Sequence, residues 1–339
     1  MPRRPRCTEA GSWSHITNRG IARRPIFERQ EDVLVLLEFI QRAVELDGLE
    51  VHAFVLLTTH FHVLARSPEG GLAIPLQRVQ NGYARWYNRS RRRDGALFRG
   101  RYRAKRVNDD RYRAAVVAYI DRNSVDAGLA TRAADYPYGS ARDYCRAGPP
   151  RYPWLTRDWV EGFVFTRSGG ASYDPHSYER VFGRMPPSLS ALVERRLERG
   201  DTPEMLPDPI ESAPDAVLDW MRRKALLADG HGVGDPLVVP DDIDEALSFV
   251  TAMEREETPW RVGRRDAWKV LRVGLLRDVA ACPLQETARR LGMTPSAVGQ
   301  LTGLHRELQL ADAQYAERAA RTVVLAMNRT WAPLWRGKR

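Results

Sequence analysis

The sequence of 339 residues contains little cysteine, and its three cysteines lie far apart, at Cys7, Cys145 and Cys282. Their spacing matches neither the ligand pattern of a zinc site nor the disulfide framework of a small secreted protein. We therefore expect the chain to work in a reducing cytoplasm, with a fold that depends on its core rather than on covalent cross-links.

Long hydrophobic runs are also missing. No stretch approaches about 18 consecutive apolar residues, the length that a membrane-spanning helix needs. No apolar run follows the basic start Met1–Arg6, so we do not expect this segment to be a signal peptide. We therefore expect no membrane partner. Hydrophobic residues still make up 43% of the chain, which is enough for a normal buried core.

Acidic residues are fewer than basic ones, 43 against 53, so the formal net charge is +10 at pH 7 and the isoelectric point is about 9.8. A positive surplus of this size favours a polyanionic partner, of which nucleic acid is the most common. Together with the cysteine content, this predicts a cytoplasmic protein associated with the nucleoid.

The first 150 residues alternate between strand and helix patterns. Strands are predicted over 13–17, 51–57, 60–65 and 97–107, and helices over 32–44, 70–87 and 108–123. This order predicts an α+β fold in which helices pack on a largely antiparallel sheet. We expect a connector with helices over residues 151–240, and an all-helical unit over residues 241–330.

The sharpest chemical pattern is His60-Phe61-His62, on the second strand of a predicted hairpin. Side chains alternate faces along a strand, so both imidazoles should project from the same face and be partly exposed. That arrangement suits the capture of one divalent metal ion. The alternative interpretation is a pair of strand histidines without a ligand. His15 and His52, which also lie on predicted strands, are interpreted mainly as structural residues, with contact to the site as the alternative.

A second pattern lies on the last predicted helix of this unit, where Tyr119 and Asn123 are four residues apart and share a face. A phenol oxygen can attack phosphorus, and an amide oxygen can bind a hard metal ion. Because tyrosine has a pKa of about 10, its attack needs help, which a metal ion that polarises the phosphate can supply. A core tyrosine is the alternative. Tyr112 is a rival nucleophile without an amide four residues further on.

Taken together, these patterns resemble the HUH single-strand endonucleases, and more narrowly the REP-associated tyrosine transposases. The matching segments follow one another between residues 12 and 145. They are Thr17–Gly20 with Pro25–Phe27, Leu57–Leu64, Tyr83–Asn88, Gly95–Tyr102, Tyr119–Asn123 with Val125, Ala127 and Gly128, and Tyr136–Tyr138 with Ser140.

The resemblance implies a ferredoxin-like catalytic domain over residues 1–150, in which His60, His62 and Asn123 hold Mg²⁺ or Mn²⁺ and Tyr119 is the nucleophile. We expect Mn²⁺ to bind more tightly, because imidazole is not a favoured ligand of Mg²⁺. The family commonly has proline after the asparagine, whereas this chain has Ser124. The implied reaction is cleavage and rejoining of hairpin-containing single-stranded DNA through a 5′-phosphotyrosine, as in transposition or the mobilisation of repeat elements.

Two other functions are consistent with the same patterns. One is a non-catalytic binder or repressor of palindromic repeats, and the other is a replication initiator or relaxase of the wider HUH group. The presence of all four site residues favours catalysis over binding alone. A single tyrosine on the motif helix, rather than a clear pair, argues against initiators that use two nucleophiles.

Basic and aromatic residues are concentrated next to the proposed site, between residues 85 and 106. Arginines can follow phosphates while aromatic rings stack on unpaired bases. The candidate DNA-binding residues are Arg85, Arg89, Arg91, Arg92, Arg93, Arg99, Arg101, Tyr102, Arg103 and Lys105, and the interleaved rings are Trp86, Tyr87, Phe98 and Tyr102. The alternative is a solvated basic turn beside core aromatic residues.

The C-terminal unit carries a second candidate DNA-binding pattern, over residues 284–302. One helix should end at Gly292, and the next should begin with Thr294 as N-cap and Pro295 in the first helical position. This resembles a helix-turn-helix, whose second helix lies in a major groove, with Ser296, Gln300 and Thr302 as the candidates to face bases. Duplex DNA that flanks the cut site would then be a further partner, unless the helices form an ordinary hairpin.

Overall fold

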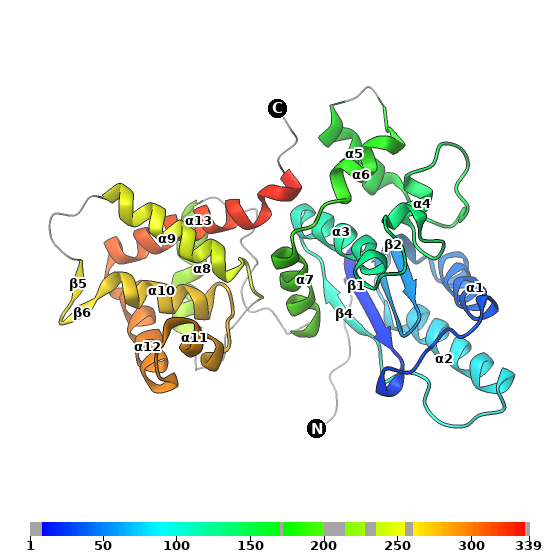
Figure 1. Ribbon diagram of the computed structural model, residues 1–339, viewed down its shortest axis with the longest axis horizontal. Helices are drawn as coiled ribbons and strands as arrows, with labels where there is room; N and C mark the ends of the chain where they lie inside the picture. The colour runs from blue at the N-terminus through cyan, green and yellow to red at the C-terminus, as the bar shows by residue number, and fades with distance from the viewer. Residues whose placement is uncertain (1–8, 170–171, 200–213, 228–234, 255–259, 336–339) are drawn as a thin grey trace. The chain divides into compact units, whose positions relative to one another are not determined.

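The computed structural model describes residues 9–169, 172–199, 214–227, 235–254 and 260–335, and the chain divides into two compact units (Figure 1). One comprises Met1–Met185 with Leu334–Arg339, and the other Pro186–Pro333. The strands are β1 Ser12–Arg19, β2 Glu50–Leu57, β3 His60–Ser67, β4 Arg103–Arg106, β5 Arg261–Val262 and β6 Arg265–Asp266. The helices are α1 Gln30–Asp47, α2 Ala73–Ser90, α3 Asp110–Asp126, α4 Ala141–Tyr144, α5 Asp158–Ser168, α6 Pro175–Phe182, α7 Pro187–Arg199, α8 Pro214–Leu227, α9 Pro240–Glu254, α10 Ala267–Asp278, α11 Leu284–Leu291, α12 Pro295–Ala311 and α13 Ala313–Trp335.

A four-stranded sheet forms the centre of the first unit. Its strand order is β2-β3-β1-β4, and every neighbouring pair is antiparallel. The two connections that contain a helix, β1-α1-β2 and β3-α2-β4, each skip over one strand that runs in the opposite direction. This is the ferredoxin-like arrangement. The predicted α+β class, with its antiparallel sheet and a helical C-terminal region, is therefore confirmed.

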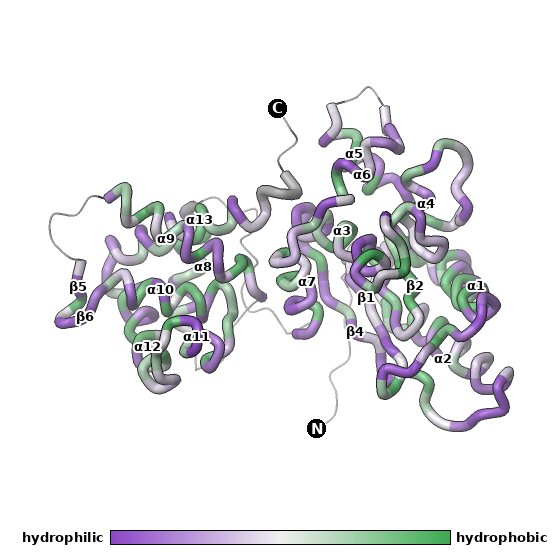
Figure 2. The backbone as a smooth tube through the Cα atoms, viewed as in Figure 1, coloured by the Kyte–Doolittle hydropathy of each residue, from purple (hydrophilic) through white to green (hydrophobic). Residues whose placement is uncertain are grey.

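Different helices cover the two faces of the sheet (Figure 1). On one face the ring of Phe98 contacts both Phe61 of β3 and Tyr83 of α2, and α1 packs beside α2. On the opposite face α3 packs against β2 and β3, with Tyr119 in ring contact with His62. A strand buried on both faces has a continuous run of apolar residues, and β2 has such a run over Ala53–Leu57, which Figure 2 shows as hydrophobic.

Helix α3 begins where the sequence predicts and ends later. Asp109 caps its first turn by accepting a hydrogen bond from a backbone N–H. The helix continues to Asp126, beyond Asn123, because Ser124 keeps the backbone N–H that proline would lack. The Ser124 hydroxyl also donates a hydrogen bond to the carbonyl of Asp121 at 3.0 Å. Asn123 therefore lies inside a regular helical turn.

The fourth strand is shorter than the sequence predicts. Alternation predicts a strand over 97–107, but β4 covers only Arg103–Arg106, and the pairing ahead of it is an isolated bridge between Phe98 and Gly20. Ahead of β4, the side-chain amide of Asn18 donates to the carbonyl of Gly100 at 3.0 Å. The carbonyl of Gly100 thus accepts a hydrogen bond from a side chain, whereas in a longer strand it would accept one from the backbone of β1. The segment before Arg103 is therefore irregular.

The outer edge of β2 is covered by the chain that follows α3. The backbone N–H of Leu56 donates to the carbonyl of Tyr138 at 2.9 Å, and that of Thr156 donates to the carbonyl of Val51 at 2.8 Å. Residues 136–156 therefore extend the hydrogen bonding of the sheet beyond β2, and the domain boundary predicted at residue 150 falls within this cover.

The segment predicted as a connector, residues 151–240, is divided between the two units. Residues up to 185 belong to the first, where Tyr178 of α6 donates a hydrogen bond to the buried carboxylate of Asp121 at 2.8 Å. The rest belongs to the second, where the buried guanidinium of Arg196 donates to the carbonyl of Pro236 at 2.9 Å.

The second unit contains the predicted pair of helices, α11 and α12. Gly292 ends α11 in the left-handed conformation with φ of 60°, and the Thr294 hydroxyl accepts a hydrogen bond from the N–H of Ala297 at 3.2 Å. Within the described part of this unit, only the short hairpin β5-β6 departs from the all-helical prediction. In the portion of the chain that the structure describes, none of the helices has the length and apolar character needed to cross a bilayer.

Candidate active site

His60 and His62 project from the same face of β3, as the alternation of a strand predicts, and their ring centroids lie 5.3 Å apart. His60 is partly exposed, whereas His62 is only 4% exposed. The prediction of two partly exposed histidines is thus correct for His60 and wrong for His62, because α3 covers the ring of His62.

Helix α3 places Tyr119 directly against His62. The two ring centroids are 5.4 Å apart, with the planes at 85°, and Tyr119 is 8% exposed. Asn123 follows one turn later, and its amide N–H donates to the carbonyl of Tyr119 at 2.6 Å. The structure therefore brings the two histidines, the phenol and the amide together on one face of the sheet.

The three predicted metal ligands each have one polar atom engaged within the protein. Nδ1 of His60 is 3.0 Å from the hydroxyl of Thr59, and Nδ1 of His62 is 3.1 Å from Nε2 of His15. The amide nitrogen of Asn123 is held by its own helix. Two imidazole Nε2 atoms and one amide oxygen form a donor set that suits Mn²⁺ and, less well, Mg²⁺. In the described structure the side chain of Asn123 also forms a hydrogen bond with His60.

The electrostatics of the pair favour neutral rings. Burial lowers the pKa of His60 and brings the pKa of His62 well below its ordinary value. The charge of Arg19 further lowers the pKa of His60, while a hydrogen bond with the Asn123 side chain raises it. A neutral imidazole keeps the lone pair that a metal ion needs. The contact between Asn123 and His60 also shows that the amide reaches the histidine pair.

Among the described residues, no group of three or more histidine, cysteine, aspartate and glutamate side chains is arranged to hold a metal ion. A site at the His60–His62 pair therefore needs a ligand of another type, and the amide oxygen of Asn123 is the candidate in contact with the pair.

Two residues near the site are not among the site residues predicted from the sequence. The sequence favours a structural role for His15, with contact to the site as the alternative, and the structure shows that contact: its ring centroid lies 5.2 Å from His62 and 5.5 Å from Tyr119, and burial lowers its pKa to about 3. Arg19 pairs with His60 across the β1–β3 ladder, so both side chains project from the same face. The two-residue period of β1 predicts that His15 and Arg19 do not lie at random on its two faces. It predicts their contact with the site only when the register between β1 and β3 is known.

His52 is a structural residue, as predicted. It is buried against Trp13, with ring centroids 4.1 Å apart, and burial, assisted by the charges of Arg113 and Arg66, lowers its pKa to about 3. Its 3.5 Å approach to Glu50 is therefore not an ion pair near neutral pH, because the ring is uncharged.

The buried histidines should make the protein sensitive to acid. The folded pKa of His15 and of His52 is about 3 against an ordinary value of 6.5, so the unfolded chain takes up protons first. Stability is then full above pH 6.5 and falls at lower pH, by up to about 1.4 kcal/mol per pH unit for each histidine. Urea unfolding at a series of pH values between 7.5 and 5 measures the slope.

The variant His52→Phe isolates one of these contributions, because His52 lies outside the candidate site. Its free energy of unfolding should fall less steeply with acid than that of the wild type. His176→Phe, at an exposed histidine of α6, is the control and should keep the wild-type slope. An equal slope in all three proteins would contradict the assignment.

The candidate DNA-binding residues of the first unit divide by exposure. Six arginines are exposed and form no ion pair with the described residues: Arg85, Arg89, Arg92, Arg99, Arg101 and Arg103. Arg93 is half-buried near the Tyr87 ring. Lys105 is 1% exposed and Tyr102 is 5% exposed, so neither can reach a phosphate or stack on a base. The prediction of DNA contact is wrong for these two residues.

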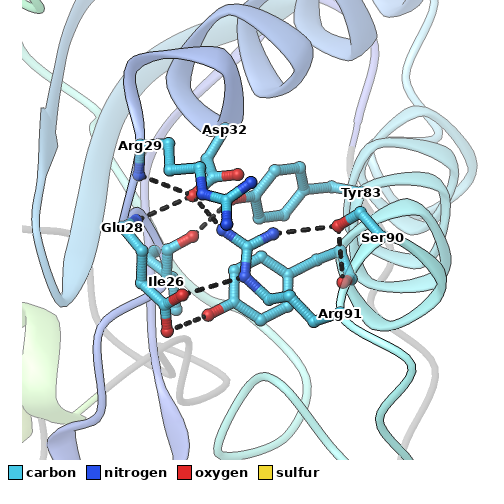
Figure 3. Close-up of polar contacts among 8 residues, drawn as sticks. Ile26, Glu28, Arg29, Asp32, Tyr83, Ser90 and Arg91 are labelled. Atoms are coloured by element: carbon cyan, nitrogen blue, oxygen red, sulfur yellow. Dashed lines mark hydrogen bonds and ion pairs between the residues drawn. The ribbon is translucent and has the colours of Figure 1, made fainter.

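Arg91 is also not part of the exposed basic surface, because its side chain is bound within the protein. Its guanidinium donates to Glu28 at 2.9 Å and to Asp32 at 2.6 Å, and it lies 3.9 Å from the centre of the Tyr87 ring (Figure 3). Two carboxylates therefore already compensate its charge. Arg91 instead connects the end of α2 to the start of α1 through these hydrogen bonds. The hydrophilic segment that follows α2 begins at this connection (Figure 2).

The irregular segment before β4 is anchored beside the histidine pair. The buried Asn18 holds the carbonyl of Gly100, and the backbone N–H of Arg99 donates to the carbonyl of Arg19 at 2.9 Å. Since Arg19 is opposite His60 in the sheet, the exposed arginines of this segment start next to the candidate metal site.

In the second unit, Ser296 and Gln300 both lie exposed on α12, as a base-contacting role requires. Thr302, which follows one turn after Val298, is buried and donates its hydroxyl to the carbonyl of that residue at 2.8 Å. Thr302 is therefore not on the outward face of α12, which continues through Gly303 and Glu307 to Leu310.

No protein-family model and no curated protein matches the sequence. Among solved structures, the fold is similar to that of a REP-associated tyrosine transposase bound to a REP hairpin. The alignment covers 46% of this chain and 98% of that chain, with a TM-score of 0.36 and 18% identical residues. This is a distant likeness, and the function proposed below rests instead on the geometry of the site.

Proposed function

We propose that this protein cuts and rejoins single-stranded DNA, with Tyr119 as the nucleophile and a divalent metal ion held by His60, His62 and Asn123. The observation that carries the proposal is the packing of Tyr119 against His62, with Asn123 one helical turn later in contact with His60. A nucleophile and three donor groups of suitable type thus share one small region.

Each group would have a defined role. The phenol oxygen of Tyr119 loses its proton and attacks phosphorus, and the bond from phosphorus to the 3′ oxygen breaks. The 5′ phosphate remains on tyrosine, while the 3′ oxygen takes up a proton and leaves as a hydroxyl. Bound Mg²⁺ or Mn²⁺ would supply polarisation of the scissile phosphate. Arg19 adds a positive charge beside His60. Because the phosphotyrosine bond conserves the energy of the broken ester, the strand can be resealed without ATP.

The substrate would be held by both units. The six exposed arginines of the first unit would follow the phosphates of a hairpin-containing single strand, starting from the segment anchored next to His60. Ser296 and Gln300 of α12 would contact bases in flanking duplex DNA.

The decisive experiment is a cleavage assay with an end-labelled hairpin oligonucleotide and Mn²⁺, in which a covalent protein–DNA band is sought on a denaturing gel. The proposal predicts a band that disappears when EDTA replaces Mn²⁺. Specific binding without any covalent band would instead favour a repressor of palindromic repeats.

The first unit should carry out the chemistry alone. We expect a fragment of residues 1–185 to cut the hairpin at nearly the full-length rate when DNA is saturating, because it contains every proposed catalytic group. It should bind more weakly and with a shallower dependence on salt, since it lacks the second unit and the phosphate contacts that this unit would make with flanking DNA. Cleavage rates at saturation and affinities across a salt series measure both expectations.

A shorter fragment ending at residue 150 is the matched comparison. It lacks Thr156 on the edge of β2 and Tyr178 on the carboxylate of Asp121. Losing one partner of a buried polar group costs about 1–3 kcal/mol, so this fragment should melt at a lower temperature than 1–185. Unchanged affinity and salt slope in 1–185 would contradict the role given to the second unit.

A further inference from the structure

A third histidine lies directly behind the candidate metal ligand His62. His15 is on β1, the strand next to β3, and is fully buried. Its Nε2 is 3.1 Å from Nδ1 of His62, and its ring also contacts Tyr119. Nδ1 of His15 has no hydrogen-bond partner among the described residues. The only polar contact of the His15 side chain in the described structure is therefore with His62.

The hydrogen bond between the two rings can form in two ways, because a neutral imidazole has one N–H and one lone pair. If His15 donates, the proton of His62 is on Nε2, and that atom cannot bind a metal ion. If His62 donates from Nδ1, the lone pair on its Nε2 is available. Histidines that bind metals almost always donate their other N–H to a neighbouring acceptor, which fixes the tautomer and the ring orientation.

We propose that His15 is a positioning residue of the metal site, which accepts the N–H of His62 and thereby holds Nε2 of His62 ready for the metal ion. The inference rests on the proposed function for the identity of the bound group. It adds a residue on a different strand to the site, with a role that is exerted through His62. The hydroxyl of Thr59, 3.0 Å from Nδ1 of His60, occupies the corresponding position for the outer ligand.

The first test measures Mn²⁺ affinity of the full-length protein by calorimetry, without DNA. His15→Leu should weaken binding by about 10–100-fold, the usual effect of removing such a partner. His15→Gln should recover most of the affinity, because its amide oxygen can accept the same N–H. His52→Leu is the control, since it also removes a buried histidine from a strand of this sheet but has no ring contact with His62, and it should bind Mn²⁺ as the wild type does.

The second test needs no variant and stands even if His15→Leu fails to fold. Nitrogen-15 NMR of the metal-free wild-type protein distinguishes the two tautomers of each histidine. The proposal predicts that the proton of His62 is on Nδ1. A proton on Nε2 of His62, or wild-type Mn²⁺ affinity in folded His15→Leu, would overturn it.

The outcomes separate this inference from the proposed function. A protein whose Mn²⁺ affinity falls in His60→Ala and in His15→Leu, but which never cuts DNA, would disprove the proposed reaction and support the role of His15. A protein that cuts DNA while His15→Leu keeps its full Mn²⁺ affinity would overturn the role of His15 alone. Mn²⁺ binding that is absent, or unaffected by His60→Ala, would overturn both.

Discussion

Replacing Tyr119 by phenylalanine should abolish the covalent protein–DNA adduct and lower the cleavage rate by roughly 10⁴-fold or more, as the loss of a nucleophile does in other enzymes. The variant keeps the ring that packs against His62 and His15, and loses only the oxygen that attacks phosphorus. Affinity for the hairpin should therefore remain near that of the wild type. The adduct is scored on a denaturing gel, and affinity is measured by a shift in native gels.

Tyr112→Phe is the matched control, because Tyr112 is also a buried tyrosine of α3. It should keep both the adduct and the rate. An adduct that persists in Tyr119→Phe would show that the nucleophile lies elsewhere, and Tyr112 would then be the first residue to test.

Replacing His60 by alanine should remove metal-dependent cleavage. One of three ligands is lost, so the Mn²⁺ affinity should fall by at least about 10-fold, the lower end of what the loss of even an outer-shell partner costs. Because His60 is partly exposed, the melting temperature should change little. His62→Ala should lose activity as well, but its side chain is buried under α3, and the cavity left behind should also cost about 2 kcal/mol of stability.

His60→Ala is thus the cleaner of the two substitutions, and His176→Ala, at an exposed histidine of α6, is its control. Cleavage is compared in Mn²⁺ and in EDTA, alongside thermal unfolding. Full activity of the wild type in EDTA would disprove a metal-dependent reaction, whatever the variants do.

Those parts of the fold and of the site that depend on local periodicity could be predicted from the sequence. The common face of His60 and His62 follows from the two-residue period of a strand, and the contact between Asn123 and the carbonyl of Tyr119 follows from the helical turn. The contact of His15 with the site depends on the register between β1 and β3, which pairs residues far apart in the chain. No local pattern contains that register.

Burial of charged residues could not be predicted for a similar reason. Arg91 belongs to a basic run, but the carboxylates that bind it belong to Glu28 and Asp32. Strands β2 and β3 separate these two residues from Arg91 in the sequence. The length of β4 depends on the side chain of Asn18, which takes the carbonyl of Gly100. A pattern of charge or alternation describes each segment alone and says nothing about such partners.

The cover over β2 determines how copies of this chain can associate. An open edge strand presents unpaired N–H and C=O groups, to which a strand of another molecule can add. The backbone groups of Val51 and Leu56 that would offer such a template are already bonded to Thr156 and Tyr138. Two copies therefore cannot merge their sheets along β2 without first displacing residues 136–156, so a dimer that keeps this cover would need contacts at other surfaces.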